Sequence, residues 1–291
     1  MIENRTPWAV ATLGISDPYG EPALCVVVEA TVGVDGTACE QPPICLDGAW
    51  AGDPAVCAPR EAPCCCMPKA GTDCLLRGHG HARTVRFRCG PVQQQARLSG
   101  ARSWVRRWFG LRPGPEAAFE PVPLLWEQAA GAQPGNPVGV GVVPRQERFR
   151  DGVPLPRIEH PARPLTRWGR CPTPVGFGPT TPAWAHRREL DAFDPAAQHV
   201  APPELIAPAL RGDENLVVDG CRQPIACQLP GLPPPQVRLA RRCGDLRPEA
   251  RLDTVLVDAD ALTIRLTWRA WCLVGEHAAV EEVIIAPGIR G

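Results

Sequence analysis

The sequence predicts a mainly β protein, built from antiparallel sheets in a sandwich-like arrangement, with long ordered Pro- and Gly-rich loops and little helix. Residues 261–271, ALTIRLTWRAW, alternate between apolar and polar side chains, a period of two that is typical of a half-buried strand. The 36 Pro and 28 Gly residues interrupt every long window, so no helix of several turns is evident. Because no helical segment separates the predicted strands, parallel βαβ architecture is disfavoured.

The strand signal falls in four segments, one central strand and three hairpins: 23–34, 83–98, 215–229 and 254–268. Residues 23–34, ALCVVVEATVGV, begin apolar on both faces, as central strands do. In the hairpin at 83–98, Val85, Phe87 and Cys89 are expected to face the core while the arginines between them face solvent. These segments justify the assignment to a mainly β class.

We expect one domain over residues 1–291, with a strand-rich N-terminal part (about 1–109), a loop-rich middle (about 110–211) and a strand-rich C-terminal part (about 212–291). The middle is dense in Pro and Gly but too apolar for a solvated linker. Its large apolar residues include Phe119, Leu124, Leu125, Trp126, Phe177 and Trp184. Ordered, irregular loops held against the sheets are therefore predicted, with Gly where two backbones approach closely.

Charge and termini limit the classes of function. The chain has 31 basic and 31 acidic residues and a net charge of zero, which argues against a general nucleic-acid binder because such proteins need a basic surplus. The N-terminal MIENRTPWAV has neither the basic nor the apolar region of a signal peptide, and no apolar run approaches a membrane span. We expect a cytoplasmic protein whose 14 cysteines are reduced and act as small buried hydrophobes.

The common catalytic motifs are absent from the sequence. It contains no Walker A motif, no G-x-S-x-G and no H-E-x-x-H, and its single lysine, Lys69, lies in no Gly-rich loop. The carboxylate pairs Asp258/Asp260 and Glu281/Glu282 are interpreted as solvated charge in turns or on strand surfaces. We therefore predict no catalytic residue, no cofactor and no enzyme activity.

The segment CAPREAPCCCMPKAGTDC, residues 57–74, holds five cysteines and raises the question of a metal site. The chain has no C-x-x-C pair, the usual unit of a structural zinc site. An extended backbone would let Cys64 and Cys66 converge, with Cys65 on the opposite face, and His79 and His81 could complete a Cys₂His₂ set. This zinc module is the alternative hypothesis. The prediction we favour is neither metal nor disulfide among Cys57, Cys64, Cys65 and Cys66, because adjacent cysteines strain a bridge.

A series of motifs in a fixed order resembles one bacterial family of unknown-function domains that is encoded beside type VI secretion genes. The motifs are NRTPW (4–8), VVVEATVGV (26–34), EQPPICL (40–46), GDP (52–54), PKAGTDCLLRGHGHA (68–82), PLLWE (123–127), NPVGVG (136–141), LPRIEHP (155–161), PVGFGP (174–179), PAW (182–184), LRGDE (210–214), LPGL (229–232) and RLDTVLVD (251–258). Each motif is weak alone, but their order is specific and spans nearly the whole chain.

Members of that family act as adaptors or chaperones for toxic effectors. The resemblance implies a non-enzymatic protein that binds an effector toxin in the cytoplasm and helps to load it on the secreted spike protein, without contacting nucleic acid or membrane. It also implies that Cys64, Cys65 and Cys66 stand where the family has ordinary residues. The segment near 190–195 is shorter than in the family, so partner choice could differ here, and a paralogue without a partner remains a third hypothesis.

Two sets of residues are candidates for special roles. The first is predicted to be architectural, with a surface recognition loop as its alternative: Trp126, Glu127, Asn136, Pro137, Gly139, Gly141, Gly176, Phe177 and Gly178. The second is a possible interaction surface, rich in the residue types that dominate interface hot spots: Trp104, Trp108, Phe109, Arg106 and Arg107. Its alternative is a strand end packed on the core with solvated arginines.

Overall fold

The structure is a computed structural model that describes residues 1–16, 20–50, 58–62, 68–131, 151–167, 172–180, 194–275 and 280–289. Within these ranges there is no α-helix, only the 3₁₀ turns η1 (Trp126–Gln128), η2 (Pro195–Gln198) and η3 (Pro203–Leu205). The mainly β class is therefore confirmed. None of the helices that the structure describes has the length and apolar character needed to span a bilayer.

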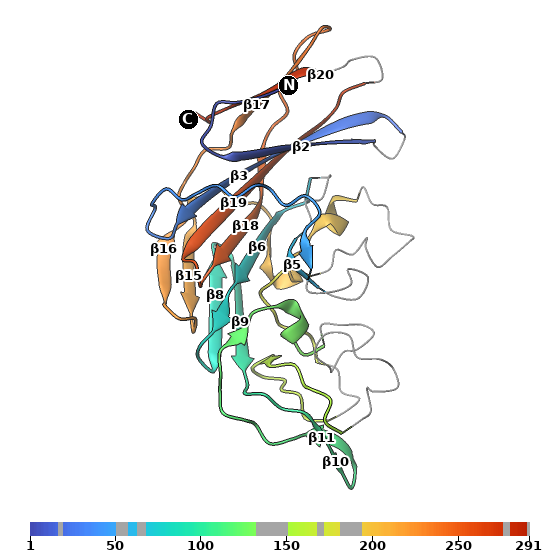
Figure 1. The fold of residues 1–291 in the computed structure, drawn as a ribbon, viewed down its shortest axis with the longest axis vertical. Coiled ribbons are helices and arrows are strands. Elements are labelled where there is room, and N and C mark those ends of the chain that lie inside the picture. Colours follow the sequence, from blue (N-terminus) through green and yellow to red (C-terminus); the bar gives the residue numbers. More distant parts are fainter. Residues whose placement is uncertain are drawn as a thin grey trace.

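Three larger sheets contain most of the strands (Figure 1). The six-stranded sheet runs, in order, β14 (Ile206–Ala207), β6 (Thr72–Arg77), β18 (Arg251–Asp258), β19 (Thr263–Leu273), β3 (Pro22–Gly33) and β2 (Ala9–Ser16). The five-stranded sheet runs β13 (Ile158–Glu159), β9 (Val92–Leu98), β8 (Thr84–Cys89), β15 (Asn215–Asp219) and β16 (Ile225–Gln228). The three-stranded sheet runs β1 (Ile2–Asn4), β20 (Val280–Ala286) and β17 (Gln236–Arg241).

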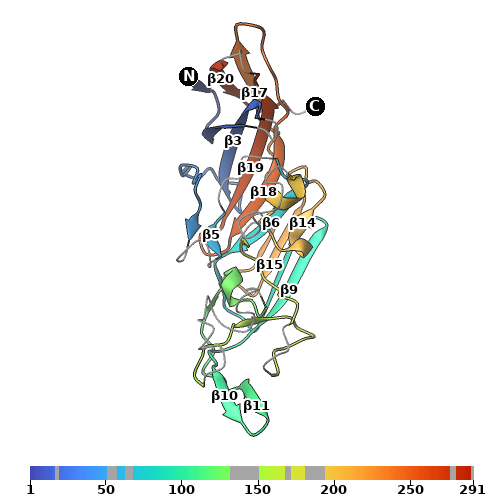
Figure 2. The same ribbon diagram turned by 90° about the vertical axis from the view of Figure 1, so that its right-hand side faces the viewer.

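Three strand pairs stand apart from these sheets. They are β10 (Trp104–Arg107) with β11 (Gly110–Pro113), β12 (Val122–Pro123) with β7 (His79–Gly80), and β4 (Ala49–Trp50) with β5 (Pro59–Glu61). The molecule is elongated, with the β10–β11 hairpin at one end and the three-stranded sheet at the other (Figures 1 and 2).

The predicted strands and hairpins are present. β3 lies between β19 and β2, as a central strand should, and the three predicted hairpins are β8–β9, β15–β16 and β18–β19. Two pairings are parallel, β18 with β6 and β1 with β20. The sequence did not suggest them, because each joins strands far apart in the chain, where a long connection permits parallel pairing.

The inward faces of the six- and five-stranded sheets form one hydrophobic core. Phe87 on β8 and Trp268 on β19 are both 1% exposed and belong to the same buried cluster. The ring of Trp268 also stacks on Trp8, with their centroids 5.2 Å apart. The alternation in β8 therefore has its expected cause, since every second side chain enters the core. β19 differs from the predicted half-buried strand, because Thr267 and Arg269 on its polar face are buried as well.

The described parts of the loop-rich middle lie on this core. Leu124 and Phe177 are fully buried in the same cluster as the strands, and Phe119 packs against it beneath the guanidinium of Arg83. Trp184 falls outside the described residues. These contacts hold the ordered loops against the sheets, where composition alone would have suggested disorder.

Trp268 supports the core, so its removal should weaken the fold. We expect Trp268→Ala to lower the free energy of unfolding by about 3–5 kcal/mol, the usual cost of truncating a buried large aromatic. Urea denaturation followed by circular dichroism measures this loss. Trp108→Ala is the matched control, because the Trp108 side chain is 99% exposed and should change stability by less than about 0.5 kcal/mol. Equal effects of the two substitutions would contradict the assignment of Trp268 to the core.

Candidate functional site

The β10–β11 hairpin stands on a small hydrophobic cluster of its own. Trp104, at the start of β10, is fully buried there, together with Leu111, Val153, Leu155 and Leu165. The backbone N–H of Trp104 donates to Val153 and its carbonyl accepts from Gly152, each at 2.9 Å. The base of the hairpin is thus held by both packing and hydrogen bonds.

The tip of the hairpin is exposed and apolar. Arg107 pairs with Gly110, so Trp108 and Phe109 occupy the turn between the strands. Gly110 has a φ of 101°, a left-handed conformation that closes such a turn and strains any other residue. Trp108 is 99% exposed and Phe109 is 91% exposed. Hereafter, the aromatic tip means Trp108 and Phe109.

Arginines surround the aromatic tip. Arg106 and Arg107 immediately precede it and are exposed, and the backbone N–H of Arg106 is held by the carboxylate of Asp151. Arg112 on β11 donates to the carbonyl of Thr166 at 3.4 Å. The end of the hairpin is therefore amphipathic, with two solvated rings beside a surplus of positive charge.

The structure divides the predicted interaction residues into two groups. Trp104 is buried at 0% exposure, so its inclusion in an interaction surface is wrong. Its ring anchors the hairpin because it packs in the small hydrophobic cluster. Trp108, Phe109, Arg106 and Arg107 do lie together at the surface. The alternative, a strand end packed on the core, thus describes the base of the hairpin but not its tip.

The predicted architectural residues form a second cluster. Trp126 is 8% exposed and packs with Ala58 and Ala129. A Cβ added at Gly176 would lie 2.5 Å from Cε3 of Trp126, so the indole needs glycine at that position. The Glu127 carboxylate accepts the backbone N–H of Ala58 at 3.2 Å.

Phe177 and Gly178 make further contacts in this part of the structure. The carbonyl of Phe177 accepts the N–H of Leu76 on β6 at 3.0 Å, and a Cβ at Gly178 would come within 2.9 Å of the carbonyl oxygen of Leu124. The PLLWE and PVGFGP motifs therefore pack against each other. Asn136, Pro137, Gly139 and Gly141 fall outside the described residues.

A buried ionic cluster lies on the other face of the six-stranded sheet. The Asp73 carboxylate on β6 is completely buried, 2.7 Å from Nζ of Lys69 and 2.6 Å from Nδ1 of His199. It also accepts the backbone N–H of Val200 at 2.9 Å, while Lys69 donates to the hydroxyl of Thr254 on β18 at 2.6 Å. Four separate segments of the chain thus meet at one carboxylate and its lysine.

These contacts set the ionisation of Asp73. Burial alone would raise its pKa, but the charge of Lys69 and the hydrogen bonds from His199, Lys69 and Val200 lower it below the usual value. Sequence reasoning passed over this cluster. The signal that could have found it is the only lysine of the chain, placed four residues before an aspartate in the motif PKAGTD.

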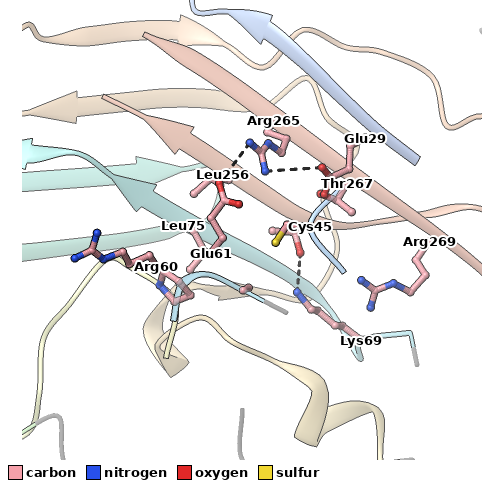
Figure 3. A pocket seen from close by; sticks show the side chains of 13 residues that line it. Glu29, Cys45, Arg60, Glu61, Lys69, Leu75, Leu256, Arg265, Thr267 and Arg269 are labelled. Carbon is pink, nitrogen blue, oxygen red and sulfur yellow. Dashed lines mark hydrogen bonds and ion pairs between the residues drawn. The ribbon is translucent and has the colours of Figure 1, made fainter. Parts of the chain in front are cut away.

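Further charged residues continue the polar face beside a small cavity (Figure 3). Arg265 on β19 lies 3.8 Å from both Glu29 and Glu61, and Arg269 pairs with Asp253 at 3.1 Å. The cavity measures about 60 Å³, whereas ligand pockets span about 300–1,000 Å³. It has room for a few water molecules and is too small for an organic substrate.

The carboxylates interpreted as solvated charge are more structured than expected. Asp258 is 14% exposed and lies 2.8 Å from Nη2 of Arg77, and it also accepts the N–H groups of Asp260 and Ala261. Glu281 pairs with Arg242 at the surface, as solvated charge does. Asp258 therefore organises the β18–β19 turn, a role that spacing alone could not distinguish from solvation.

Only His79 and His81 of the four predicted zinc ligands lie among the described residues, so the zinc module stays a hypothesis. The His79 ring lies 2.7 Å from the carboxylate of Asp260, and the backbone of His81 donates to Gly220. Cys57, Cys64, Cys65 and Cys66 fall outside the described ranges. Among the residues that the structure does describe, no group of three His, Cys, Asp or Glu side chains could hold a metal ion.

The described cysteines are free thiols, and several are buried. Cys74 is fully buried between the sheets, as a small hydrophobe would be. Its contact with Cys89 and its burial raise the pKa of its thiol, and burial raises the pKa of Cys221 to about 12. These thiols remain protonated at neutral pH, which makes them poor nucleophiles and poor metal ligands.

A family described as an uncharacterized protein conserved in bacteria (DUF2169) matches residues 19–269. That range includes the five-stranded sheet, the β10–β11 hairpin and the Asp73 cluster, and it includes the six-stranded sheet except β2 and the last four residues of β19. Neither the curated proteins nor the solved structures provide a match. The shortened segment near 190–195 falls mostly on residues outside the described part of the chain.

The Asp73 cluster predicts a specific dependence of stability on pH. Because the folded state lowers the pKa of Asp73, the carboxylate contributes stability above its unfolded pKa, and that stability is lost as pH falls through the folded value. We expect Asp73→Asn to lower the free energy of unfolding at pH 7 by about 3–5 kcal/mol, since it leaves a buried charge unpaired.

Urea denaturation at a series of pH values checks this expectation, and the difference between Asp73→Asn and the parent chain should shrink in acid. Asp245→Asn is the matched control. Its ion pair with Arg238 is well exposed, with side chains 36% and 40% accessible, and should contribute at most about 1 kcal/mol. A pH-independent difference for Asp73→Asn would show that shape, not charge, is what the site requires.

The ionisation of Glu29 should change stability with pH in the direction opposite to that of Asp73. Burial raises the pKa of Glu29, against the opposing charge of Arg265 and a hydrogen bond from Thr267, so the folded state favours the protonated acid. Ionisation therefore costs stability as pH rises through the folded pKa. We expect Glu29→Gln to be more stable than the parent chain at pH 8, with the advantage vanishing near pH 4. Thermal unfolding at both pH values tests the sign.

Proposed function

Because the chain belongs to the DUF2169 family of bacterial proteins, we propose that it is a non-enzymatic adaptor or chaperone of a type VI secretion system. In this proposal it binds an effector toxin in the cytoplasm and helps to place the toxin on the secreted spike protein. The motif series from NRTPW to RLDTVLVD links the chain to a family whose members have this role. The observation that carries the proposal is the aromatic tip.

Two large aromatic rings that stay exposed at the end of a hairpin do not contribute the free energy that their burial would give on folding. Burying a side chain such as Phe is worth about 1.5–3 kcal/mol, and Trp108 and Phe109 forgo it almost completely at 99% and 91% exposure. Large exposed apolar groups are characteristic of interaction sites. The tip is best explained as a contact that becomes buried when a partner is bound.

The contacts that hold the base of the hairpin favour a binding mode in which the aromatic tip enters a pocket of the partner. Trp104 and the small hydrophobic cluster hold the base of the hairpin, and the backbone of Arg106 is tied to Asp151. A preorganised anchor loses little conformational entropy when it enters a pocket. Two aromatic residues beside arginines also match the composition of interface hot spots.

The chemistry of the tip describes the partner surface. It should contain an apolar pocket for the two rings, bordered by carboxylates that face Arg106 and Arg107. Complementary charge at such a rim raises the association rate more than the affinity. An adaptor that retains its cargo needs an interface of at least standard size, about 1,200–2,000 Å² in total, so the tip would be its anchor and not its full extent.

Co-expression with the toxin encoded by a neighbouring gene tests the proposal. We expect the parent chain to increase the solubility of the toxin and its association with the spike protein. The double variant Trp108→Ala/Phe109→Ala should weaken toxin binding by about thirty-fold or more, since even a single hot-spot aromatic contributes about 2 kcal/mol or above, while the melting temperature is unchanged.

Ile289→Ala is the matched control, because Ile289 is an exposed apolar residue, 78% accessible, that follows β20 in the chain. β20 lies at the opposite end of the molecule from the hairpin (Figure 1). If toxin solubility and spike association are the same with and without the protein, the adaptor role is wrong. If the protein supports both but the double variant does so equally well, the role stands and the tip is not its anchor.

A further inference from the structure

The strand β2 is an open edge of the six-stranded sheet. It pairs with β3 along its whole length, Ala9 to Ser16, and stands last in the strand order. Among the described residues, no hydrogen bond reaches the backbone of residues 9–16 from any segment other than β3. Every second residue of β2 therefore directs its N–H and C=O groups away from the sheet, toward the position of a further strand.

The other edge strands of the larger sheets differ from β2 in length or charge. Four of them are very short: β14 and β13 have two residues each, β1 has three and β16 has four. β17 has six residues but carries Arg238 and Arg241 and a register shift at its end. Short length, charge and irregularity are the usual means by which proteins prevent unwanted pairing at an edge.

β2 has none of these protections. Its eight residues, AVATLGIS, include no charged residue and no proline, and the pairing with β3 shows no register shift. An unprotected edge of this length would be a liability if it remained exposed. Among the six edge strands of the larger sheets, β2 is the longest and combines that length with the absence of charge, proline and register shift.

We propose that the occupant is β2 of a second copy of this chain, paired antiparallel about a twofold axis at Thr12, so that two six-stranded sheets join into one. A residue whose N–H and C=O groups point away from the sheet must lie opposite another such residue. Because these residues alternate along β2, the twofold axis must pass through a residue and not between two. The proposal does not depend on the adaptor function, and β2 precedes the region that matches the family.

The register centred on Thr12 makes the strand complementary to itself. On one face it places Ala9 opposite Ile15 and Ala11 opposite Leu13, so a small side chain meets a large one in both pairs. On the other face Thr12 meets its own copy, and directly opposed threonines form favourable cross-strand pairs.

The same register avoids two common penalties. Gly14 meets Val10, which again places a small residue opposite a larger one. Because the segment is uncharged, the twofold axis brings no like charges together, which would otherwise destabilise a self-paired strand. A closed twofold dimer also leaves no open β2 edge, so assembly stops at two copies.

Gly14 offers a clean way to block the pairing. It is exposed, and a Cβ added there would have no atom within 4 Å, so substitution should leave the single chain intact. We expect the full-length chain to sediment as a dimer at about 50 µM and Gly14→Lys to sediment as a monomer with the same melting temperature, because edge lysines oppose strand pairing. Gly14→Ala is the matched control and should remain a dimer.

A cross-link tests the register itself. Directly opposed residues have Cα atoms about 4.5–5.5 Å apart, within the range of a disulfide. Mild oxidation with diamide should therefore link Thr12→Cys into a covalent dimer, whereas the parent chain treated in the same way should not cross-link at this strand.

The inference is overturned if the parent chain is a monomer at 50 µM, if Gly14→Lys remains a dimer, or if Thr12→Cys fails to cross-link. A monomer that loses its toxin in the Gly14→Lys variant would assign the edge to a strand of the partner protein instead and would likewise reject the second copy. Loss of dimerisation with toxin binding intact would support the second copy and leave the adaptor role unaffected.

Discussion

The second, polar face of the six-stranded sheet depends on the interactions of one buried carboxylate, that of Asp73. A sheet normally buries one face and leaves the other to water, but here the second face of the six-stranded sheet is covered as well, and its charged residues are buried with it. A buried charge is tolerated only when it is paired and hydrogen-bonded. Lys69, His199 and the backbone of Val200 supply those partners to Asp73.

This requirement decides where the connecting segments lie. Lys69 precedes β6 and His199 follows η2, so their contacts with Asp73 fasten two loops to the sheet. The PLLWE and PVGFGP motifs fasten another part of the middle through Trp126 and Gly176. Described parts of the Pro- and Gly-rich middle are thus attached to the sheets by specific contacts at Asp73 and at Trp126.

The residues that form the main core are separate from those of the proposed recognition surface. The main core lies between the two larger sheets, whereas the aromatic tip stands on a separate hydrophobic cluster at the end of the molecule (Figure 2). Substitutions at the tip should therefore leave the core intact. The β2 edge belongs to a different region, so the proposed partner surface and the proposed dimer edge do not overlap.

The sequence by itself determined the β class, the three hairpins, the central strand and the inward residues of β8 and β19, because period-two alternation is a local consequence of strand geometry. It also placed Trp108, Phe109, Arg106 and Arg107 together as one candidate surface. Only the tertiary structure decided that Trp104 belongs to the base of the hairpin and not to its tip, since burial depends on segments more than 40 residues away, such as Leu155 and Leu165. The parallel pairings likewise join residues as far apart as Ile2 and Val283, 281 positions, and His199 reaches Asp73 across 126 positions. No local pattern of residues carries information about contacts of that range.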